Sequence, residues 1–589
     1  MLTSLLLCAL SGVRAARTWI DVTQQYVTNP SFDDNTSDGW TATGFYSKLD
    51  VQFGCMEFWN GTFTLSQQLS GLPDGQYRLR VQGFYRTRDN NTAYQSHQNR
   101  TENITAFLYA GAAQTKLHSV YDESFGVNLA NNCWGQGNWW EGIKYFPNGM
   151  ASAHEAFEMG RYENLLEFSV VGGSVVIGIR NATSQNDNWC IFDNFRLEYF
   201  DEVDEAAAGN VLLNEVMAAN VDMFWSETAN FDGWAELYNP TDRPVMLGGC
   251  YLSDDANRLT LWRIPDEAGA IAAHGYGVVW FDDSGLSSRH APFKLDTDGG
   301  SLYLSNSKGE LMATVDYPKA LPRTSYARTA DGTGPWALTA MPTPRRSNSS
   351  SAFATQQLPM PVADKPSQLF SGSLTVEVQI PEGATLRYTT DGTTPTYDNG
   401  VVSTTGRFTV SSTTNYRFRL FRDGWLPSNV LTCSYIATNN HYTIPVVSIV
   451  ADNEFLYGNK YGVMTQGTNG KPGHGQAQPC NWNMDWERPV SFVYFGPDGR
   501  QLFSQEVNLE MCGGWSRAWT PHSFKLKANK VFGTGKTLDF PFFEQKPFIR
   551  NRTLQLRNGG NDTQCRFKDA ALETILFRSG IDLDVQSYQ

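Results

Sequence analysis

Charged side chains are scarce in this sequence. They occupy 18% of its 589 positions, and 46 lysines and arginines stand against 60 aspartates and glutamates, which gives a net charge of −14. The basic residues form no block along the chain. An acidic surface without basic blocks repels phosphate backbones, so we expect no nucleic-acid partner.

Long apolar runs are also missing. Beyond the N-terminus no stretch approaches the ~20 apolar residues that a helix needs to cross a bilayer, so we expect a chain that does not span a membrane. The N-terminus has a short apolar core, Leu5–Leu10, followed by Ala15 and Ala16. This order is typical of a secretory signal peptide. We assign residues 1–16 to it and expect a secreted or cell-surface protein.

Several catalytic and metal motifs are absent as well. There is no HExxH and no paired CxxC, so zinc has no support. The segment FGTGKT has Lys530 where a phosphate-binding loop needs glycine. GWSRA has Ala518 in place of the second glycine of a nucleophile elbow. A glycan hydrolase remains a weak alternative, because no pair of carboxylates stands out.

Cysteine is infrequent, with nine residues of which Cys8 falls in the signal peptide. Eight in an exported chain permit disulfides, and Cys133 with Cys190, or Cys480 with Cys512, are candidate pairs. The domains are large enough to fold without them, so buried free thiols are the alternative.

Glycine and aromatic residues, in contrast, are abundant: 52 Gly, 17 Trp and 13% aromatics in all. This composition suits β-sandwiches with glycine-rich turns. The length predicts about three to five domains.

Residues 17–203 begin with NPSF and close with DNFRLEY, and the segments between them alternate polar and apolar residues as strands and hairpins do. This bracket resembles galactose-binding-like jelly rolls, often carbohydrate-binding modules, whose first and last strands pair. The resemblance implies a structural calcium near Asp193, with Asp33 and Asp34 as further ligands. Asp193 acting only as a turn cap is the alternative.

The middle of this domain carries NNCWGQGNWWEG, with Trp134, Trp139 and Trp140 among Gly, Asn and Gln. Flat rings stack on sugar rings while amides bond their hydroxyls, so these residues are glycan-binding candidates. The alternative is a long loop that folds its own aromatic core over the sandwich.

Residues 204–348 contain VLLNEVMAAN, DGWAELYNPTDRPVMLGGCYLSDD and PTPRRSN in order. They resemble the lamin-tail domain, a small immunoglobulin-like sandwich. Glu215 and Glu236 are expected to cap turns and satisfy strand ends there, not to catalyse. Residues 349–366, rich in Ser, Gln and Pro, are expected to be a linker.

Residues 367–438 carry RYTTDGTTPT, followed by an alternating strand. They resemble the immunoglobulin-like C-terminal module of chitobiases and β-hexosaminidases, a non-catalytic accessory sandwich. Asp391 and Gly392 are expected to form a hairpin turn.

Residues 441–589 contain IPVVSIVADNEFLYG, WERPVSFVYFGPDG and LRNGGND in order. They resemble the start of the CotH family of atypical kinases, which implies ATP, Mg²⁺ and an exported protein substrate. The resemblance makes Lys525, Lys527, Arg557 and Asn558 nucleotide-binding candidates, although His522 stands where the family commonly has lysine. The family's metal-binding carboxylates come after the point where this sequence stops, so we expect no catalytic residues here and no activity from this chain alone.

The helix expected at Phe567–Ile575 should expose an apolar face, because its covering half is missing. The expected fold class is mostly β: tandem sandwiches (jelly roll, lamin-tail and immunoglobulin-like) followed by a partial α+β kinase domain.

Two functions are in competition. Resemblance to exported modular proteins of Bacteroidetes-like bacteria implies a cell-surface protein with glycan-binding-like modules and a CotH-type kinase domain. The alternative is a non-catalytic adhesin or scaffold that binds a glycan or cell-surface polysaccharide.

Overall fold

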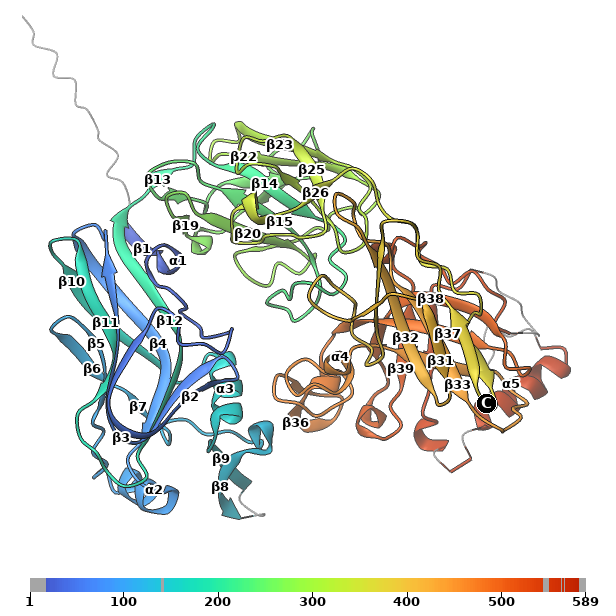
Figure 1. Ribbon diagram of the computed structural model, residues 1–589, viewed down its shortest axis with the longest axis horizontal. Helices are drawn as coiled ribbons and strands as arrows, with labels where there is room; N and C mark the ends of the chain where they lie inside the picture. The colour runs from blue at the N-terminus through green and yellow to red at the C-terminus, as the bar shows by residue number, and fades with distance from the viewer. Residues whose placement is uncertain (1–16, 139–141, 544–549, 563, 566, 582–589) are drawn as a thin grey trace, which may run out of the picture. The chain divides into compact units, whose positions relative to one another are not determined.

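The computed structural model describes residues 17–138, 142–543, 550–562, 564–565 and 567–581 (Figure 1). The chain forms two compact units. The first comprises Met1–Asn210, Asn239–Gly249 and Asp266–Gly275, and the second comprises Val211–Tyr238, Cys250–Pro265 and Tyr276–Gln589. With 42% strand and 11% helix, the prediction of a mostly β protein with several sheets is confirmed.

The first unit is built on a ten-stranded sheet, which we call the jelly roll. Its main path runs β10-β4-β12-β3-β11-β5-β6, while β1 pairs with β12, β2 with β3 and β7 with β4. The strands are β1 (Arg17–Asp21), β2 (Thr41–Gln52), β3 (Cys55–Ser70), β4 (Gly75–Arg86), β5 (Ala106–Ala110), β6 (Ala113–Lys116), β7 (His118–Ser119), β10 (Glu163–Val170), β11 (Ser174–Asn181) and β12 (Trp189–Glu202).

Alternation of side chains explains these strands. In β10, exposed and buried positions alternate along its whole length, because successive side chains point to opposite faces. Leu166, Phe168 and Val170 enter the main core, while Glu163 and Glu167 face solvent.

The first and last strands of the jelly roll pair, as the resemblance implied. β1 runs antiparallel to β12, with Arg17 opposite Glu202 and Asp21 opposite Glu198. The two strands that flank Gly172 and Gly173 do not pair with each other: β10 pairs with β4, whereas β11 pairs with β3 and β5. The turn at Gly172 and Gly173, both at positive φ, therefore connects two separate parts of the sheet.

A smaller aromatic core lies beside this sheet. It is formed by α2 (Asn90–Gln98), α3 (Met150–Glu158) and the hairpin of β8 (Cys133–Asn138) with β9 (Gly142–Pro147) (Figure 1). Phe84 and Trp189 of the sheet also belong to it, so this smaller core is fixed to one face of the jelly roll. A short helix, α1 (Thr23–Tyr26), follows β1, and the remaining strands of the unit are β13 (Asp204–Glu205), β16 (Val245–Met246) and β19 (Ala270–Ile271).

The second unit begins with two sheets that we call the first sandwich. The seven-stranded sheet has the order β21-β20-β15-β14-β24-β25-β26, and the four-stranded sheet has the order β18-β17-β22-β23. These strands are β14 (Leu212–Met217), β15 (Gly233–Tyr238), β17 (Tyr251–Ser253), β18 (Trp262–Arg263), β20 (Tyr276–Phe281), β21 (His290–Ala291), β22 (Gly300–Ser305), β23 (Leu311–Tyr317), β24 (Ser325–Arg328), β25 (Trp336–Thr339) and β26 (Phe353–Ala354).

A five-stranded and a two-stranded sheet form what we call the second sandwich. Its strands are β27 (Gln368–Phe370), β28 (Leu374–Glu377), β29 (Thr385–Thr389), β30 (Val401–Ser403), β31 (Arg407–Val410), β32 (Thr414–Phe421) and β33 (Leu431–Ala437).

The hairpin connection predicted at Asp391 and Gly392 is longer than these two residues, because β29 ends at Thr389 and its antiparallel partner β30 begins at Val401. Asp391 and Gly392 lie within the long connection from β29 to β30, where the Asp391 carboxylate accepts from the Thr393 amide at 3.0 Å. A Cβ on Gly392 would lie 1.9 Å from the Ala451 carbonyl oxygen. Glycine is therefore required for close approach to the next part of the chain.

The last sheet, which we call the C-terminal sheet, has the order β34-β37-β38-β39-β40. Its strands are β34 (Val446–Val450), β37 (Glu487–Phe495), β38 (Gln501–Met511), β39 (Phe524–Lys527) and β40 (Thr553–Leu556), accompanied by the hairpin of β35 (Lys471–Gly473) with β36 (Gln476–Cys480) and by helices α4 (Asn453–Tyr457) and α5 (Lys568–Arg578). The helix predicted at Phe567–Ile575 is present as α5, and its apolar side is exposed: Phe567 is 52% and Ile575 58% accessible.

Two sequence features have a different structural setting from the one expected. The segment 349–366 is packed: β26 lies in the first sandwich, and Leu358 is buried in the core of the second. Cys133, Cys190, Cys480 and Cys512 are free thiols, so neither candidate pair forms a disulfide. Among the described residues, no helix is both long and apolar enough to cross a membrane.

Candidate functional site

The jelly roll contains a cleft of about 490 Å³ between β2, the ends of β3, β4 and β12, and the connection from β9 to α3. Two tryptophans from neighbouring strands meet in it, because Trp59 of β3 pairs in register with Trp189 of β12. Trp59 is half-buried, whereas Trp189 is buried and belongs to the smaller aromatic core. The cleft therefore offers one accessible indole on a rigid base.

A chain of polar contacts fixes one wall. The Trp189 indole Nε1 donates to Glu57 at 2.8 Å, and Lys48 donates to the other oxygen of Glu57 at 3.0 Å. Lys48 also pairs with Asp50 at 2.8 Å. The hydrogen bond to Asp50, followed by that to Glu57, raises the pKa of Lys48, and the same bond from Lys48 lowers the pKa of Asp50.

Arg86 forms the floor of the cleft. Its side chain is buried, and its Nη1 donates to Asn90 at 3.0 Å and to Asn148 at 2.8 Å. The guanidinium carbon lies 5.2 Å from the Trp59 ring centroid and 5.3 Å from that of Trp189. Burial lowers the pKa of Arg86, and its Nε has no hydrogen-bond partner among the described residues.

The formal charges of the cleft cancel. Lys48 and Arg86 are balanced by Asp50 and Glu57, and Lys48 is already paired with both carboxylates. Such a surface offers hydrogen-bond donors and acceptors beside an aromatic face without net attraction for an ion. It suits a neutral ligand rich in hydroxyl groups.

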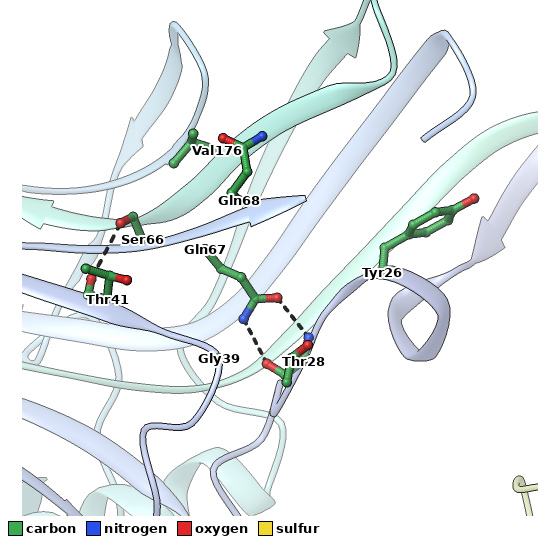
Figure 2. Close-up of a pocket in the computed structure, with 8 residues that line it drawn as sticks. All are labelled: Tyr26, Thr28, Gly39, Thr41, Ser66, Gln67, Gln68 and Val176. Atoms are coloured by element: carbon green, nitrogen blue, oxygen red, sulfur yellow. Dashed lines mark hydrogen bonds between the residues drawn. The ribbon is translucent and has the colours of Figure 1, made fainter. Parts of the chain in front are cut away.

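A second hollow of about 490 Å³ lies elsewhere on the jelly roll. Figure 2 shows that the Gln67 amide is occupied with the backbone of Thr28, accepting from its N–H at 2.8 Å and donating to its carbonyl at 2.9 Å. Tyr26 is the one aromatic residue on its wall, and none of the lining side chains is charged. With its most buried amide committed to the fold, this hollow is the weaker candidate.

The predicted glycan platform is described only in part. Trp134 lies on β8 and packs against Tyr94, Tyr121 and Phe146, with ring centroids 5.3, 5.9 and 6.1 Å away. This is the aromatic loop core that the sequence left as the alternative. Trp139 and Trp140 lie outside the described residues.

Of the predicted calcium ligands, Asp33 lies near Asp193, but no third acidic side chain joins them among the described residues. Asp193 is buried at a bulge in β12, where its carboxylate accepts from the Asn194 amide at 2.6 Å. Burial, with a contribution from nearby Asp33, raises the pKa of Asp193 to about 8. Asp34 is exposed, and no three acidic, His or Cys residues cluster in the part of the chain that the structure describes.

The nucleotide-binding candidates lie on β39 and directly after the end of its neighbour β40. Lys527 of β39 pairs with Glu487 and, at 3.0 Å, with Glu510, while Arg557 pairs with Asp569. Asn558 is buried, and its backbone N–H donates to the Ser523 hydroxyl at 2.9 Å. The backbone of Lys525 pairs with Glu510 and Gln555, and its side chain has no hydrogen bond or ion pair with a described residue.

Glu215 and Glu236 stand opposite each other on β14 and β15, both fully buried. Glu215 accepts from the Thr343 amide at 3.1 Å, and Glu236 accepts from the Arg345 amide. Burial raises the pKa of Glu215 to about 7. The two carboxylates therefore accept hydrogen bonds from backbone N–H groups of the segment that follows β25 and hold that segment in place.

The sequence did not single out the cleft residues. Trp59, Trp189 and Arg86 belong to three strands that are distant in sequence, and each lies where consecutive residues of its strand are buried or half-buried, so no alternating pattern marks it. Only the register of β3 with β12 places the two tryptophans together. The two tryptophans themselves, each within a strand-like segment, were the available signal.

Two family models match parts of the chain. Residues 204–319 match the Lamin Tail Domain, and residues 365–432 match the Chitobiase/beta-hexosaminidase C-terminal domain. The protein is multimodular and rich in β structure. No curated protein matches the chain significantly.

Two solved structures are also similar. TmCBM61 in complex with β-1,4-galactotriose is 15% identical and covers 29% of this chain and 96% of that chain, with a TM-score of 0.16. The BSP domain of a biofilm associated protein is 8% identical over 69% of each chain, with a TM-score of 0.10. TM-scores of this size do not establish a shared fold.

Proposed function

We propose that this protein binds a carbohydrate through its jelly roll, with the cleft at Trp59 as the binding site. The observation that carries the proposal is a half-exposed indole held against a buried arginine, in a cleft whose charges cancel. The sandwiches then serve as accessory modules of a carbohydrate-binding adhesin or scaffold.

The chemistry of the cleft matches a sugar ring. The Trp59 face can stack on the apolar C–H face of a pyranose, while the Asn148 amide group and the Gln52 side-chain oxygen can bond its hydroxyls. The Gln52 Nε2 already donates to Asp50 at 2.8 Å. A hydroxyl oxygen can also accept from a guanidinium such as that of Arg86. A phosphate or other anion gains little here, because each cation already has a balancing carboxylate nearby.

Glycan binding is tested by calorimetric titration of the full chain with neutral oligosaccharides, β-1,4-galactotriose among them. Trp59→Ala should lower the affinity at least about tenfold, the loss of roughly 1.4 kcal/mol that removing one aromatic stack brings. The matched control is Trp336→Ala, because the Arg328 guanidinium carbon lies 4.8 Å from the Trp336 ring centroid in the first sandwich. Equal affinities of wild type and Trp59→Ala for every sugar bound would reject the cleft.

We also propose a structural calcium at Asp193. A buried carboxylate next to a second acid, Asp33, is a setting that a cation would relieve. Backbone carbonyls of the surrounding loop would have to complete the ligand set, because no third acidic, His or Cys side chain joins Asp193 and Asp33 among the described residues. A chelator should lower the melting temperature of the jelly roll, and an unchanged melting curve would favour the turn-cap role.

Phosphoryl transfer is a second proposal, for residues 441–589. It rests on the order of CotH-type motifs and on Lys525 of β39, whose side chain has no ion pair or hydrogen bond with a described residue. Phosphoryl transfer would require ATP with Mg²⁺ and an exported protein as its substrate. The chain would also have to be secreted or carried to the cell surface to meet that substrate. Metal-dependent labelling by radiolabelled ATP that Lys525→Ala abolishes would support a kinase, and labelling that Lys525→Ala leaves unchanged would argue against a site at this lysine.

A further inference from the structure

Four charged side chains are buried together in the second unit, although they come from distant segments. Asp222 and Arg323 belong to the first sandwich, Arg417 to β32 of the second sandwich and Glu506 to β38 of the C-terminal sheet. Arg323 binds Asp222 with two parallel hydrogen bonds, Nε to Oδ1 at 2.7 Å and Nη2 to Oδ2 at 2.9 Å.

Glu506 connects the remaining members. Its Oε1 accepts from Arg323 Nη2 at 3.0 Å and from Arg417 Nη2 at 3.0 Å. All four side chains are at most 14% exposed. Two positive and two negative charges cancel, and removal of any one leaves an uncompensated charge in a buried setting, which is strongly destabilising.

A loop of the first sandwich, residues 222–232, also enters the hydrophobic core of the C-terminal sheet. Trp225 stacks on Tyr461 with ring centroids 4.4 Å apart, and Phe231 meets Phe455 at 5.3 Å. Ala229 is 5% exposed and belongs to the same core cluster as residues of β37 and β38. The core of the C-terminal sheet therefore includes residues from the first sandwich.

The same loop supplies hydrogen-bond acceptors to that core. The buried Trp486 indole donates to the Thr228 carbonyl at 2.8 Å. Arg488 is fully buried, donates to the Ala229 carbonyl at 2.9 Å and has its guanidinium carbon 4.9 Å from the Trp225 ring centroid. No described carboxylate pairs with Arg488, so loop carbonyls and indole faces surround its charge instead.

We infer that the loop 222–232, together with Arg323, is the docking surface for the C-terminal sheet, and that both sandwiches and this sheet unfold as one cooperative body. The lamin-tail match is then not a self-contained module here. It contributes part of the core on which the C-terminal residues fold, so those residues produced without it should lack a stable core.

Native-state hydrogen exchange of the full chain tests this without any variant. The slowest amides of β14, β32 and β37 should exchange through one opening reaction, with the same dependence on denaturant concentration. Three different dependences would mean three independent modules and would overturn the inference.

A variant extends the test. Glu506→Gln should raise exchange about a hundredfold in β14, β32 and β37 alike, the scale expected when one partner of a buried ionic set is removed. The control is Arg407→Met, whose exposed pair with Glu377 at 3.4 Å should leave all three strands unchanged. Faster exchange confined to the C-terminal sheet would refute the coupling.

A milder change covers the case in which Glu506→Gln does not fold. Trp225→Phe keeps an aromatic ring but reduces its contact with Tyr461 and Arg488. Exchange in β14 and β37 should rise by the same factor. An increase limited to the loop itself would count against one cooperative body.

Discussion

Asp193 gives the sharpest prediction, because the residue is 1% exposed and the pKa of its carboxyl group is raised to about 8. When the pKa of an acid is higher in the folded than in the unfolded protein, the folded protein binds that proton more tightly, so protonation of the acid stabilises the fold. Without a cation, stability is therefore greatest below the ordinary carboxyl pKa of about 3.9 and falls as the pH rises towards about 8. Each pH unit in this window costs about 1.4 kcal/mol.

At pH 7 the accumulated loss is about 4 kcal/mol, an upper figure because local relaxation and water reduce it. Asp193→Asn keeps the shape of the side chain and removes the ionisable proton. Without calcium, at pH 7, we expect this variant to melt about 10 °C above the wild-type jelly roll, from roughly 2–4 °C per kcal/mol for a domain of this size.

Calorimetric melting of the full chain in EDTA, from pH 5 to pH 8, measures the effect. The difference between variant and wild type should grow with pH. Calcium should stabilise the wild type more strongly as the pH rises, because binding displaces a proton, and should not stabilise Asp193→Asn. Parallel pH profiles of the two proteins in EDTA would show that Asp193 is already ionised and compensated, and would refute the reasoning.

Three further outcomes are expected. Lys527→Met should lower the free energy of unfolding in urea by about 1 kcal/mol or less, since the ion pairs of Lys527 are partly exposed. Because Lys527 is already paired with two glutamates, a much larger loss of nucleotide affinity in Lys527→Met than in Lys525→Ala would contradict this assignment. Ile575→Lys should change stability by less than about 0.5 kcal/mol, because the side chain is 58% exposed; strong destabilisation would mean that this face is covered. Cys190, whose pKa burial raises well above its usual value, should resist iodoacetamide at pH 8 until the protein is unfolded; rapid native labelling would show that the jelly roll opens.

The repeating part of the fold could be read from the sequence. Alternation in Gln76–Arg86 and in Leu166–Asn181 predicted strands, and these segments contain most of β4 and of β10, and the whole of β11. Helix α5 was also predictable from its local pattern. The pairing of β10 with β4 was not, because Gly172 and Gly173 fit a hairpin turn and a crossing between distant strands equally well.

The site was harder to predict for the same reason. The local density of tryptophan in NNCWGQGNWWEG drew attention to Trp134, which packs against Tyr94 and Tyr121. The cleft depends instead on Trp59 and Trp189, which are 130 positions apart and meet through strand register. Hydrophobic periodicity specifies which face a residue occupies, but it does not specify which strand lies beside it.

The pairing of β1 with β12 places the two ends of the jelly roll side by side. Arg17 lies opposite Glu202, and the Cα atoms of such antiparallel partners are about 5 Å apart. A domain whose chain enters and leaves at one point can be inserted into a surface loop of another protein without separating that loop's ends. The jelly roll is therefore suited to insertion into other proteins by gene fusion. It would carry its cleft intact into proteins that have none of the other modules of this chain.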